Sequence, residues 1–180
     1  MDPIPLPDPP LADELIALAP FAERDLDALV NACNDPAIAE YTFIPAPYAR
    51  ADAKLFVSGQ AERRRAGEAI DLAIRSRDGA LLGATGLRVF RPERESCEIG
   101  YWVAADTRGR GIAPRAVRML ADWALTSLPV TRIELTPDVE NRASHRVAEK
   151  AGFELTPERR ETFAKGRHWE FLVYALDGQG

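Results

Sequence analysis

Two glycines and four arginines are concentrated in the segment ADTRGRGIAPRAVRML, which covers residues 105–120. No acidic residue occurs between Arg108 and Arg118, although the whole chain has a net charge of −5. The spacing of apolar residues from Ile112 onward predicts a helix that continues to about Ser127. A helix start offers unpaired N–H groups and the positive end of the helix dipole, and glycines let an anion approach them closely. The segment therefore predicts a phosphate-binding site.

The usual nucleotide-binding motifs do not account for this segment. The sequence has no GxxxxGK(S/T) motif, and its GRG lacks the third glycine of the GxGxxG motif. An ATP or NAD site is therefore not supported. A solvated basic turn in front of an ordinary helix is the alternative interpretation of these residues.

A second group of polar residues opens a helix that we predict over residues 141–151. Asn141 is a typical N-cap residue. Ser144 shares the 0, 3, 4, 7 spacing of one helix face with Val147, Ala148 and Ala151, so its hydroxyl should face inward. A hydroxyl in that position needs a hydrogen-bond partner. The residues alone leave open whether Ser144 takes part in chemistry or is a polar surface residue.

Both segments resemble the GNAT superfamily of acyl-CoA-dependent N-acetyltransferases. Arg108, Gly111 and Ala113, after the strand EIGYWV, match the family's pyrophosphate motif Gln/Arg-x-x-Gly-x-Gly/Ala. ENRASHRVAEKAGFE, residues 140–154, resembles its second signature, an Asn-x-x-Ser helix that ends in Glu-Lys-x-Gly-Phe. DLAIRSRDGALLGATGL is similar to the central hairpin, so the resemblance covers residues 12–176. It is closest to the branch that contains the ribosomal-protein alanine and serine N-acetyltransferases, which also holds small-molecule acetyltransferases.

The resemblance implies that acetyl-CoA lies between two splayed strands, EIGYWVA and RIELTPD, with its pyrophosphate on the amides of residues 108–113. Pantetheine would pair with backbone near residues 102–104 and bond to Asn141, and Arg108 is the arginine that matches the motif. Arg110 and Arg115 could also reach the phosphates, or they could be solvated surface residues. Ser144 would donate a hydrogen bond to the CoA sulfur or protonate it through water. The expected acetyl-CoA-binding residues are Trp102, Val103, Ala104, Arg108, Gly109, Arg110, Gly111, Ile112, Ala113, Asn141 and Ser144.

A thioester is already activated, so orientation can supply much of the rate and few catalytic side chains are needed. Besides Ser144, the candidates are two glutamates that could act as general base, directly or through water. Glu98 lies on the strand that leads into the cleft, and Glu161 lies near the acceptor side. Each could equally be a solvent-facing strand residue. His145 and His168 have no partner readable in the sequence and are expected at the surface.

The elements that position these residues follow from periodicity and turn signals. Alternating Ile70, Leu72 and Ile74, the Asp78-Gly79 turn and LLGATGLRVF predict an antiparallel hairpin. A helix is expected over residues 51–65, and two strands close the chain. The fold class is α+β (mixed α/β), and the resemblance implies a GNAT fold: a six- to seven-stranded, mostly antiparallel sheet with splayed central strands and about four helices. We expect a proline-rich arm (1–11), one domain (12–176) and a short tail (177–180).

Composition narrows the function classes. With 46% hydrophobic and 28% charged residues, the 180-residue chain is expected to form one globular domain. Its net charge of −5 argues against nucleic-acid binding, and no apolar run approaches the roughly 18 residues of a membrane span. The acidic, proline-rich start does not resemble a targeting segment, so a cytoplasmic location is expected. Cys33 and Cys97 lack metal-ligand spacing, so we expect buried thiols and no metal.

These observations predict an enzyme that moves an acetyl group from acetyl-CoA to a primary amine, either a protein N-terminus or a small molecule. Its partner would be the amine-bearing acceptor, and the resemblance also allows a homodimer. One alternative is a non-catalytic module of the same fold that binds or senses acyl-CoA. The third hypothesis is a binding module for an unrelated acidic or nucleotide ligand, and it depends only on the arginine-rich segment 105–120.

Overall fold

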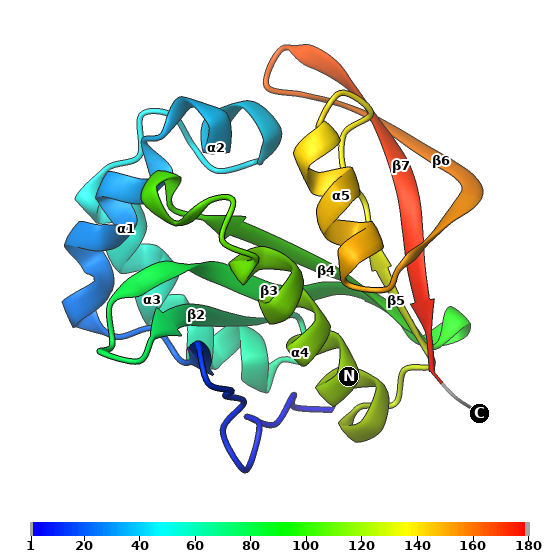
Figure 1. The fold of residues 1–180 in the computed structure, drawn as a ribbon, viewed down its shortest axis with the longest axis horizontal. Coiled ribbons are helices and arrows are strands. Elements are labelled where there is room, and N and C mark those ends of the chain that lie inside the picture. The colour runs from blue at the N-terminus through cyan, green and yellow to red at the C-terminus, as the bar shows by residue number, and fades with distance from the viewer. Residues whose placement is uncertain (1, 179–180) are drawn as a thin grey trace.

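One seven-stranded sheet in the order β1-β2-β3-β4-β5-β7-β6 organises the computed structural model, which describes residues 2–178 (Figure 1). All neighbouring strands are antiparallel except β4 and β5, which are parallel. The predicted mixed, mostly antiparallel sheet is therefore confirmed. The strands are β1 (Ile16–Ala19), β2 (Ile70–Ser76), β3 (Leu81–Arg91), β4 (Ser96–Val103), β5 (Arg132–Leu135), β6 (Glu154–Ala164) and β7 (Arg167–Asp177).

The described residues form five α-helices, one more than expected: α1 (Leu26–Cys33), α2 (Pro36–Tyr41), α3 (Arg50–Arg65), α4 (Ile112–Ser127) and α5 (Arg142–Lys150). The unexpected helix is α2, which lies in a stretch predicted to be irregular. Its start has a clear local cause, because the Asp35 carboxylate accepts a hydrogen bond from the N–H of Ala37 and Pro36 occupies the first turn.

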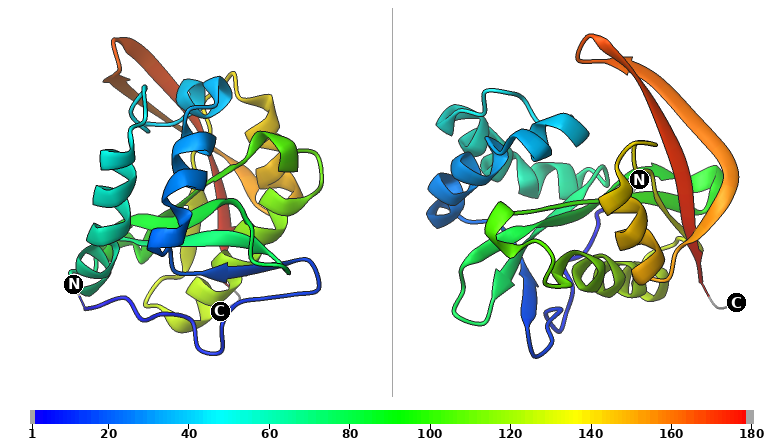
Figure 2. Two further views of the ribbon diagram at one scale, coloured as in Figure 1. Left: turned by 90° about the vertical axis from the view of Figure 1, so that its left-hand side faces the viewer. Right: turned by 45° about the horizontal axis from the view of Figure 1, so that its top comes forward.

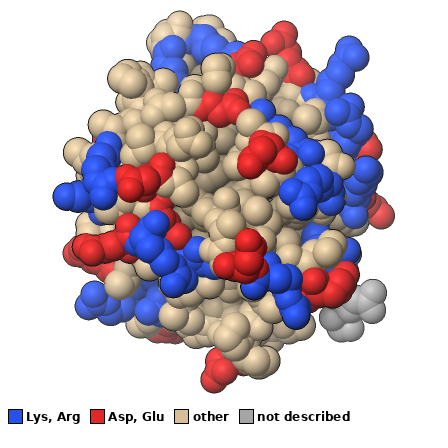
Figure 3. Space-filling model, turned by 60° about the vertical axis from the view of Figure 1, so that its left-hand side comes forward, with Lys and Arg blue, Asp and Glu red and all other residues tan. Residues whose placement is uncertain are grey.

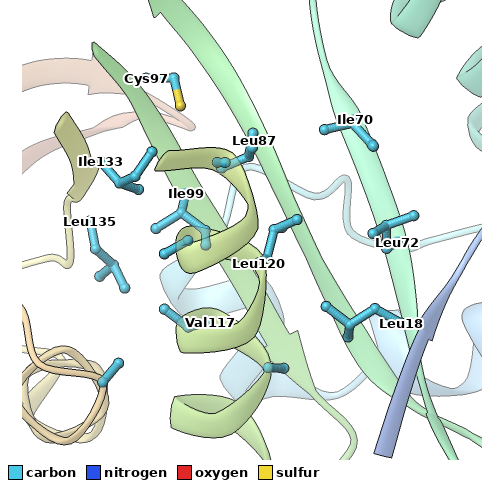
Figure 4. Packing of buried hydrophobic residues seen from close by; sticks show 14 of the residues in the cluster. Leu18, Ile70, Leu72, Leu87, Cys97, Ile99, Val117, Leu120, Ile133 and Leu135 are labelled. Carbon is cyan, nitrogen blue, oxygen red and sulfur yellow. The ribbon is translucent and has the colours of Figure 1, made fainter. Parts of the chain in front are cut away.

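The two faces of the sheet are covered by different helices. Ile70, Leu72 and Ile74 pack with α4 and α5, whereas Ala73 between them packs with α1 and α3. On the face of the sheet that α4 covers, Leu120 of α4 and the apolar residues of β2 belong to one continuous core (Figure 4). The period-two alternation of the strands therefore decides which helices cover each side.

Both cysteines are buried, as the sequence predicts. Cys97 lies in the core beneath α4, and Cys33 lies in the smaller core between α1 and α3. Burial raises the pKa of each thiol to about 12. Neither sulfur is a nucleophile at neutral pH, because the thiolate is the reactive form.

The N-terminal arm is held against α3. Ile4 is 3% exposed, and its N–H donates to the carbonyl of Arg64 while the Arg64 guanidinium donates to the carbonyl of Ile4. Met1 of the predicted arm and residues 179–180 of the predicted tail lie outside the described residues. No helix within residues 2–178 is long and apolar enough to cross a membrane.

The β6–β7 hairpin stands away from the rest of the sheet and bends over α5 toward α2 (Figure 2, right). Lys165 in its turn anchors it there, since its ammonium donates to the carbonyls of Ala39 (3.2 Å), Thr42 (2.9 Å) and Ile44 (2.5 Å). The turn of the hairpin is thus held to α2 and to the loop that follows it.

Candidate active site

The central parallel pair of strands separates after three residue pairs. Residues 96–98 of β4 pair with residues 132–134 of β5, and β4 then continues to Val103 with β3 as its neighbour. The space between β4 and β5 is therefore a wedge that opens toward the end of β4. This confirms the splayed central strands that the sequence resemblance implied.

One edge of β4 is free along this wedge. The N–H of Ala104 donates to the carbonyl of Leu82, on the β3 side. Backbone groups alternate in direction along an antiparallel strand, so the N–H and C=O of Val103 point into the wedge. The Trp102 side chain packs against the core between α1 and α3. Of the predicted segment 102–104, Val103 is thus the residue whose backbone can pair with an extended ligand.

The glycine-containing loop at the mouth of the wedge presents free amides. Gly109 and Gly111 have φ values of 74° and 76°, in the left-handed region that glycine adopts most easily. Within residues 2–178, none of the N–H groups of residues 109–113 donates to a protein acceptor. Ile112 and Ala113 are each 6% exposed and fix the first turn of the 16-residue helix α4. This geometry fits a diphosphate group.

The arginines near this loop differ in how freely they can move. Arg108 Nη2 lies 3.0 Å from Asp35 Oδ2, so Arg108 is held at the start of α2. Arg115 Nη1 lies 2.7 Å from Asp13 Oδ2 and 2.8 Å from Glu14 Oε1. Arg110 is exposed and forms no ion pair within the described chain. Charges of both signs are also interspersed over the face in Figure 3, rather than gathered into one basic surface.

Ser144 faces inward at the start of α5, as its spacing predicts. It is 7% exposed, and its hydroxyl oxygen accepts a hydrogen bond from Tyr101 Oη at 2.9 Å. Asn141 caps the helix by accepting from the N–H of Ser144 at 3.1 Å, which leaves its amide NH₂ for a ligand. The contact between β4 and α5 spans the wedge.

Tyr101 was not singled out from the sequence, although its place was predictable. The period-two pattern of β4 places Tyr101 on the same face as Ile99 and Val103, and this pattern predicts an apolar core residue. Burial raises the pKa of Tyr101 to about 12, and the hydrogen bond with Ser144 offsets this only in part. The phenol therefore stays protonated near neutral pH. Which hydroxyl it reaches depends on where α5 lies, and the strand pattern does not contain that information.

Glu98 is held in a network of ion pairs at the closed end of the wedge. Its Oε1 lies 2.5 Å from Arg91 Nη2 and 2.7 Å from Arg160 Nη1. The same two arginines bind Glu134, which is 2% exposed, at 3.2 and 2.7 Å. Two guanidinium groups thus engage the Glu98 carboxylate. This arrangement favours a role in joining strands β3, β4, β5 and β6.

Glu161 has a different environment. It is exposed and lies opposite Glu170 on β7, at an open cavity of about 400 Å³. The residues that line this cavity are Asp138, Val139, Glu140, Glu161, Arg167, His168, Trp169 and Glu170. Residues 138–140 lead directly into Asn141, and the N–H of Val139 donates to the carbonyl of Glu170. The cavity therefore adjoins the first turn of α5.

Side chains from α2 also approach this acidic cavity. Burial raises the pKa of Tyr41, with a further contribution from Glu40 and smaller ones from Glu140 and Asp138. Four of the cavity's lining residues are carboxylates, so the region attracts a cation. Within the described residues, no group of three or more His, Cys, Asp or Glu side chains is arranged to hold a metal ion.

The two histidines differ from each other. His168 is exposed, as expected, but His145 is half-buried, and its Nε2 lies 3.2 Å from the carbonyl oxygen of Val139. Its ring also lies 5.7 Å from that of Tyr174. The prediction of a surface position for His145 was wrong because α5 packs this side against β7.

Comparison with known proteins supports the class of protein that the sequence motifs resemble, the GNAT acetyltransferases. The model of the acetyltransferase (GNAT) domain matches residues 16–154. YdaF of Bacillus subtilis (strain 168), provisionally named a ribosomal N-acetyltransferase, is 33% identical over 100 residues, 55% of each chain. The uncharacterized N-acetyltransferase p20 of Bacillus licheniformis is 27% identical over 92% of this chain and 94% of its own.

A solved structure gives the same result at the level of the fold. RimJ of Mycobacterium smegmatis, in complex with CoA-disulfide, superposes with a TM-score of 0.81 at 25% identity, over 93% of this chain and 85% of that one. The domain match covers most of the sequence and coincides with the splayed sheet. The chain belongs to the GNAT family of acetyltransferase enzymes, and its resemblance to the ribosomal-protein branch is confirmed.

Proposed function

We propose that this protein transfers an acetyl group from acetyl-CoA to a primary amine, which is either a protein N-terminus or a small molecule. The observation that carries the proposal is the row of free amides at residues 109–113, placed at the mouth of a wedge whose β4 edge is unpaired. An anion at the helix start and an extended amide-bearing arm along the strand would satisfy both sets of groups.

On the donor side, where acetyl-CoA would bind, each group has a proposed role. The amides of residues 109–113 bind the diphosphate, with Arg110 free to add charge. Val103 pairs with the pantetheine arm, and the Asn141 amide bonds to it from α5. When bound, acetyl-CoA supplies an activated thioester, so the protein's main task at the sulfur is to place a hydrogen-bond donor there. Ser144 has the position to do this.

The acceptor side requires a group that takes a proton from the amine. An alkyl amine is protonated at neutral pH, and it must lose a proton before it can act as a nucleophile. We propose Glu161 as this base, directly or through water, because it is exposed at an acidic cavity beside α5. Glu98 is the weaker candidate because Arg91 and Arg160 hold its carboxylate.

The acceptor class stays open between two kinds of amine. YdaF is provisionally named for ribosomal acetylation, but this chain matches only 55% of its length. A spermidine N-acetyltransferase from Vibrio cholerae shares the fold at 20% identity with a TM-score of 0.75. The acidic cavity suits a cationic amine of either kind.

Thermal unfolding with CoA and acetyl-CoA, run beside ATP and NAD at equal concentration, tests the donor site. A ligand at 100 times its dissociation constant adds about 2.7 kcal/mol to stability, which raises the midpoint measurably. We expect a rise with the CoA compounds alone, followed by acetylation of peptides or polyamines detected by mass. No shift with CoA would contradict the proposal, and binding without acetylation of any amine would favour a non-catalytic acyl-CoA sensor.

A further inference from the structure

The hydrogen bond between Tyr101 and Ser144 crosses the wedge at the point where β4 and β5 have separated. Tyr101 lies opposite Thr85 of β3 in the register of the sheet, so its position is fixed by the neighbouring strand. Ser144 is fixed by the first turn of α5, which Asn141 caps. The 2.9 Å contact therefore joins two rigid elements, and it determines where the serine hydroxyl can point.

The direction of this hydrogen bond matters chemically. Tyr101 is the donor and Ser144 Oγ the acceptor, so the proton of the serine hydroxyl remains available. No other side-chain hydrogen bond of Ser144 Oγ occurs within residues 2–178. A hydroxyl that accepts one hydrogen bond is polarised and becomes a better donor in the next one. The chain of donors thus runs from the tyrosine through the serine toward an acceptor in the wedge.

We propose that Tyr101 is a positioning residue that holds the Ser144 hydroxyl as a hydrogen-bond donor to the sulfur of CoA. This inference rests on the proposed function, in which the sulfur lies beside Ser144. Tyr101 does not touch the sulfur, and no proton leaves the phenol. The pair stabilises the negative charge that the sulfur carries as a thiolate.

The surroundings of Tyr101 suit this role. Burial is the main cause that keeps its pKa near 12, and no charged side chain contributes to the shift. The phenol thus remains a donor over the range in which a thiol ionises, since an unperturbed cysteine thiol has a pKa of about 8.5. A phenylalanine would preserve the packing against the core beneath α4 and remove only the donor.

The test measures the ionisation of bound CoA, which needs no acceptor amine. The alkylation rate of the CoA thiol is followed against pH, free and bound to saturating protein, for wild type, Tyr101→Phe, Ser144→Ala and the double variant. Tyr48→Phe is the matched control, because Tyr48 is 7% exposed in the other core and its hydroxyl makes no hydrogen bond within the described chain. Titration calorimetry gives the CoA dissociation constant of each variant.

We expect wild-type protein to lower the pKa of the bound thiol below that of free CoA. Tyr101→Phe and Ser144→Ala should each raise it by about one unit, a tenfold change in the ionisation constant. The double variant should match Ser144→Ala, and Tyr48→Phe should match wild type. Dissociation constants for protonated CoA should change little.

Three results would overturn the inference. If Ser144→Ala shifts the thiol pKa and Tyr101→Phe does not, the serine acts without the tyrosine. If neither variant shifts it while CoA binds normally, the pair does not face the sulfur, and the proposed donor site survives. If wild-type protein binds no CoA, the proposed function fails and this inference fails with it.

Discussion

The proposed donor side and the proposed acceptor side of the wedge are built in different ways. The donor side uses consecutive residues, because the loop at 109–113 and the end of β4 are neighbours in the chain and offer backbone groups. The proposed acceptor side uses side chains from two remote segments, residues 138–140 and the β6–β7 hairpin, near Tyr41 of α2. Their meeting point is anchored by Lys165.

This difference explains why the binding of acetyl-CoA can be inferred in more detail than the binding of the acceptor amine. Backbone amides bind a diphosphate whatever the neighbouring side chains are, so a short glycine motif is sufficient to define the donor site. An acceptor site made of side chains changes with each substitution on its walls. The ion pairs of Glu98 and Glu134 lie at the closed end of the wedge, where they join strands β3, β4, β5 and β6 beneath both sides.

Glu134→Gln should have the largest effect and disturb both sides. Glu134 is 2% exposed among Arg91, Arg132 and Arg160, and loss of its charge removes the carboxylate that all three guanidinium groups contact. We expect about 3 kcal/mol lower stability, and a midpoint about 6–12 °C lower for a domain of this size. Glu158→Gln, which loses an exposed pair at 3.6 Å, should change the midpoint by less than about 1 °C.

Glu134 should also affect how the stability of the fold depends on pH. Burial alone would raise the pKa of Glu134, but the hydrogen bond and charge of Arg160, with Arg91 and Arg132, hold it below its ordinary value of 4.5. A carboxyl with a depressed pKa stabilises the fold above its unfolded pKa, and this contribution is lost as pH falls through the folded-state value. Unfolding midpoints should therefore fall more steeply below pH 4.5 in wild type than in Glu134→Gln. Equal slopes would contradict the assignment.

Glu161→Gln should affect the acceptor side alone. Removal of a general base lowers turnover by about a hundredfold or more, and CoA affinity should stay unchanged because the donor groups are elsewhere. Glu154→Gln, on the same strand and outside the acidic cavity, is the control. A wild-type rate in Glu161→Gln, together with a large loss in Glu98→Gln, would reverse our choice between the two glutamates.

Gly111→Ala, in the loop before α4, and Gly166→Ala, in the turn of the β6–β7 hairpin, are a matched pair of variants. Their φ values are 76° and 72°, and an added Cβ meets nothing within 4 Å at either position. Each should cost about 1 kcal/mol through backbone strain, so the unfolding midpoints should fall equally. Gly111→Ala should weaken CoA binding about tenfold, because the free amides depend on this turn, and Gly166→Ala should leave it unchanged. Equal CoA affinities would show that the loop does not bind the ligand.

The features that the sequence predicts and those that it does not predict follow the same division. The hairpin, the start of α4 and the inward position of Ser144 are local, since turn residues and periodicity determine them, and all were predicted. The short helix α2 was missed, although Asp35 and Pro36 mark its start. The Tyr101 contact and the ion pairs of Glu98 depend on how distant elements pack. No spacing in the sequence contains that information.

Lys165→Met should have the smallest effect and the most selective one. Its ammonium holds the hairpin turn to three carbonyls at the end of α2, in an exposed position where such bonds contribute at most about 1 kcal/mol. We expect a midpoint about 1–3 °C lower, a KM for the amine about threefold higher, and the same dissociation constant for CoA. Lys54→Met on the exposed face of α3 is the control for loss of a surface charge. If CoA affinity fell with amine affinity, the hairpin would serve both sides, and the separation between donor and acceptor regions would have to be abandoned.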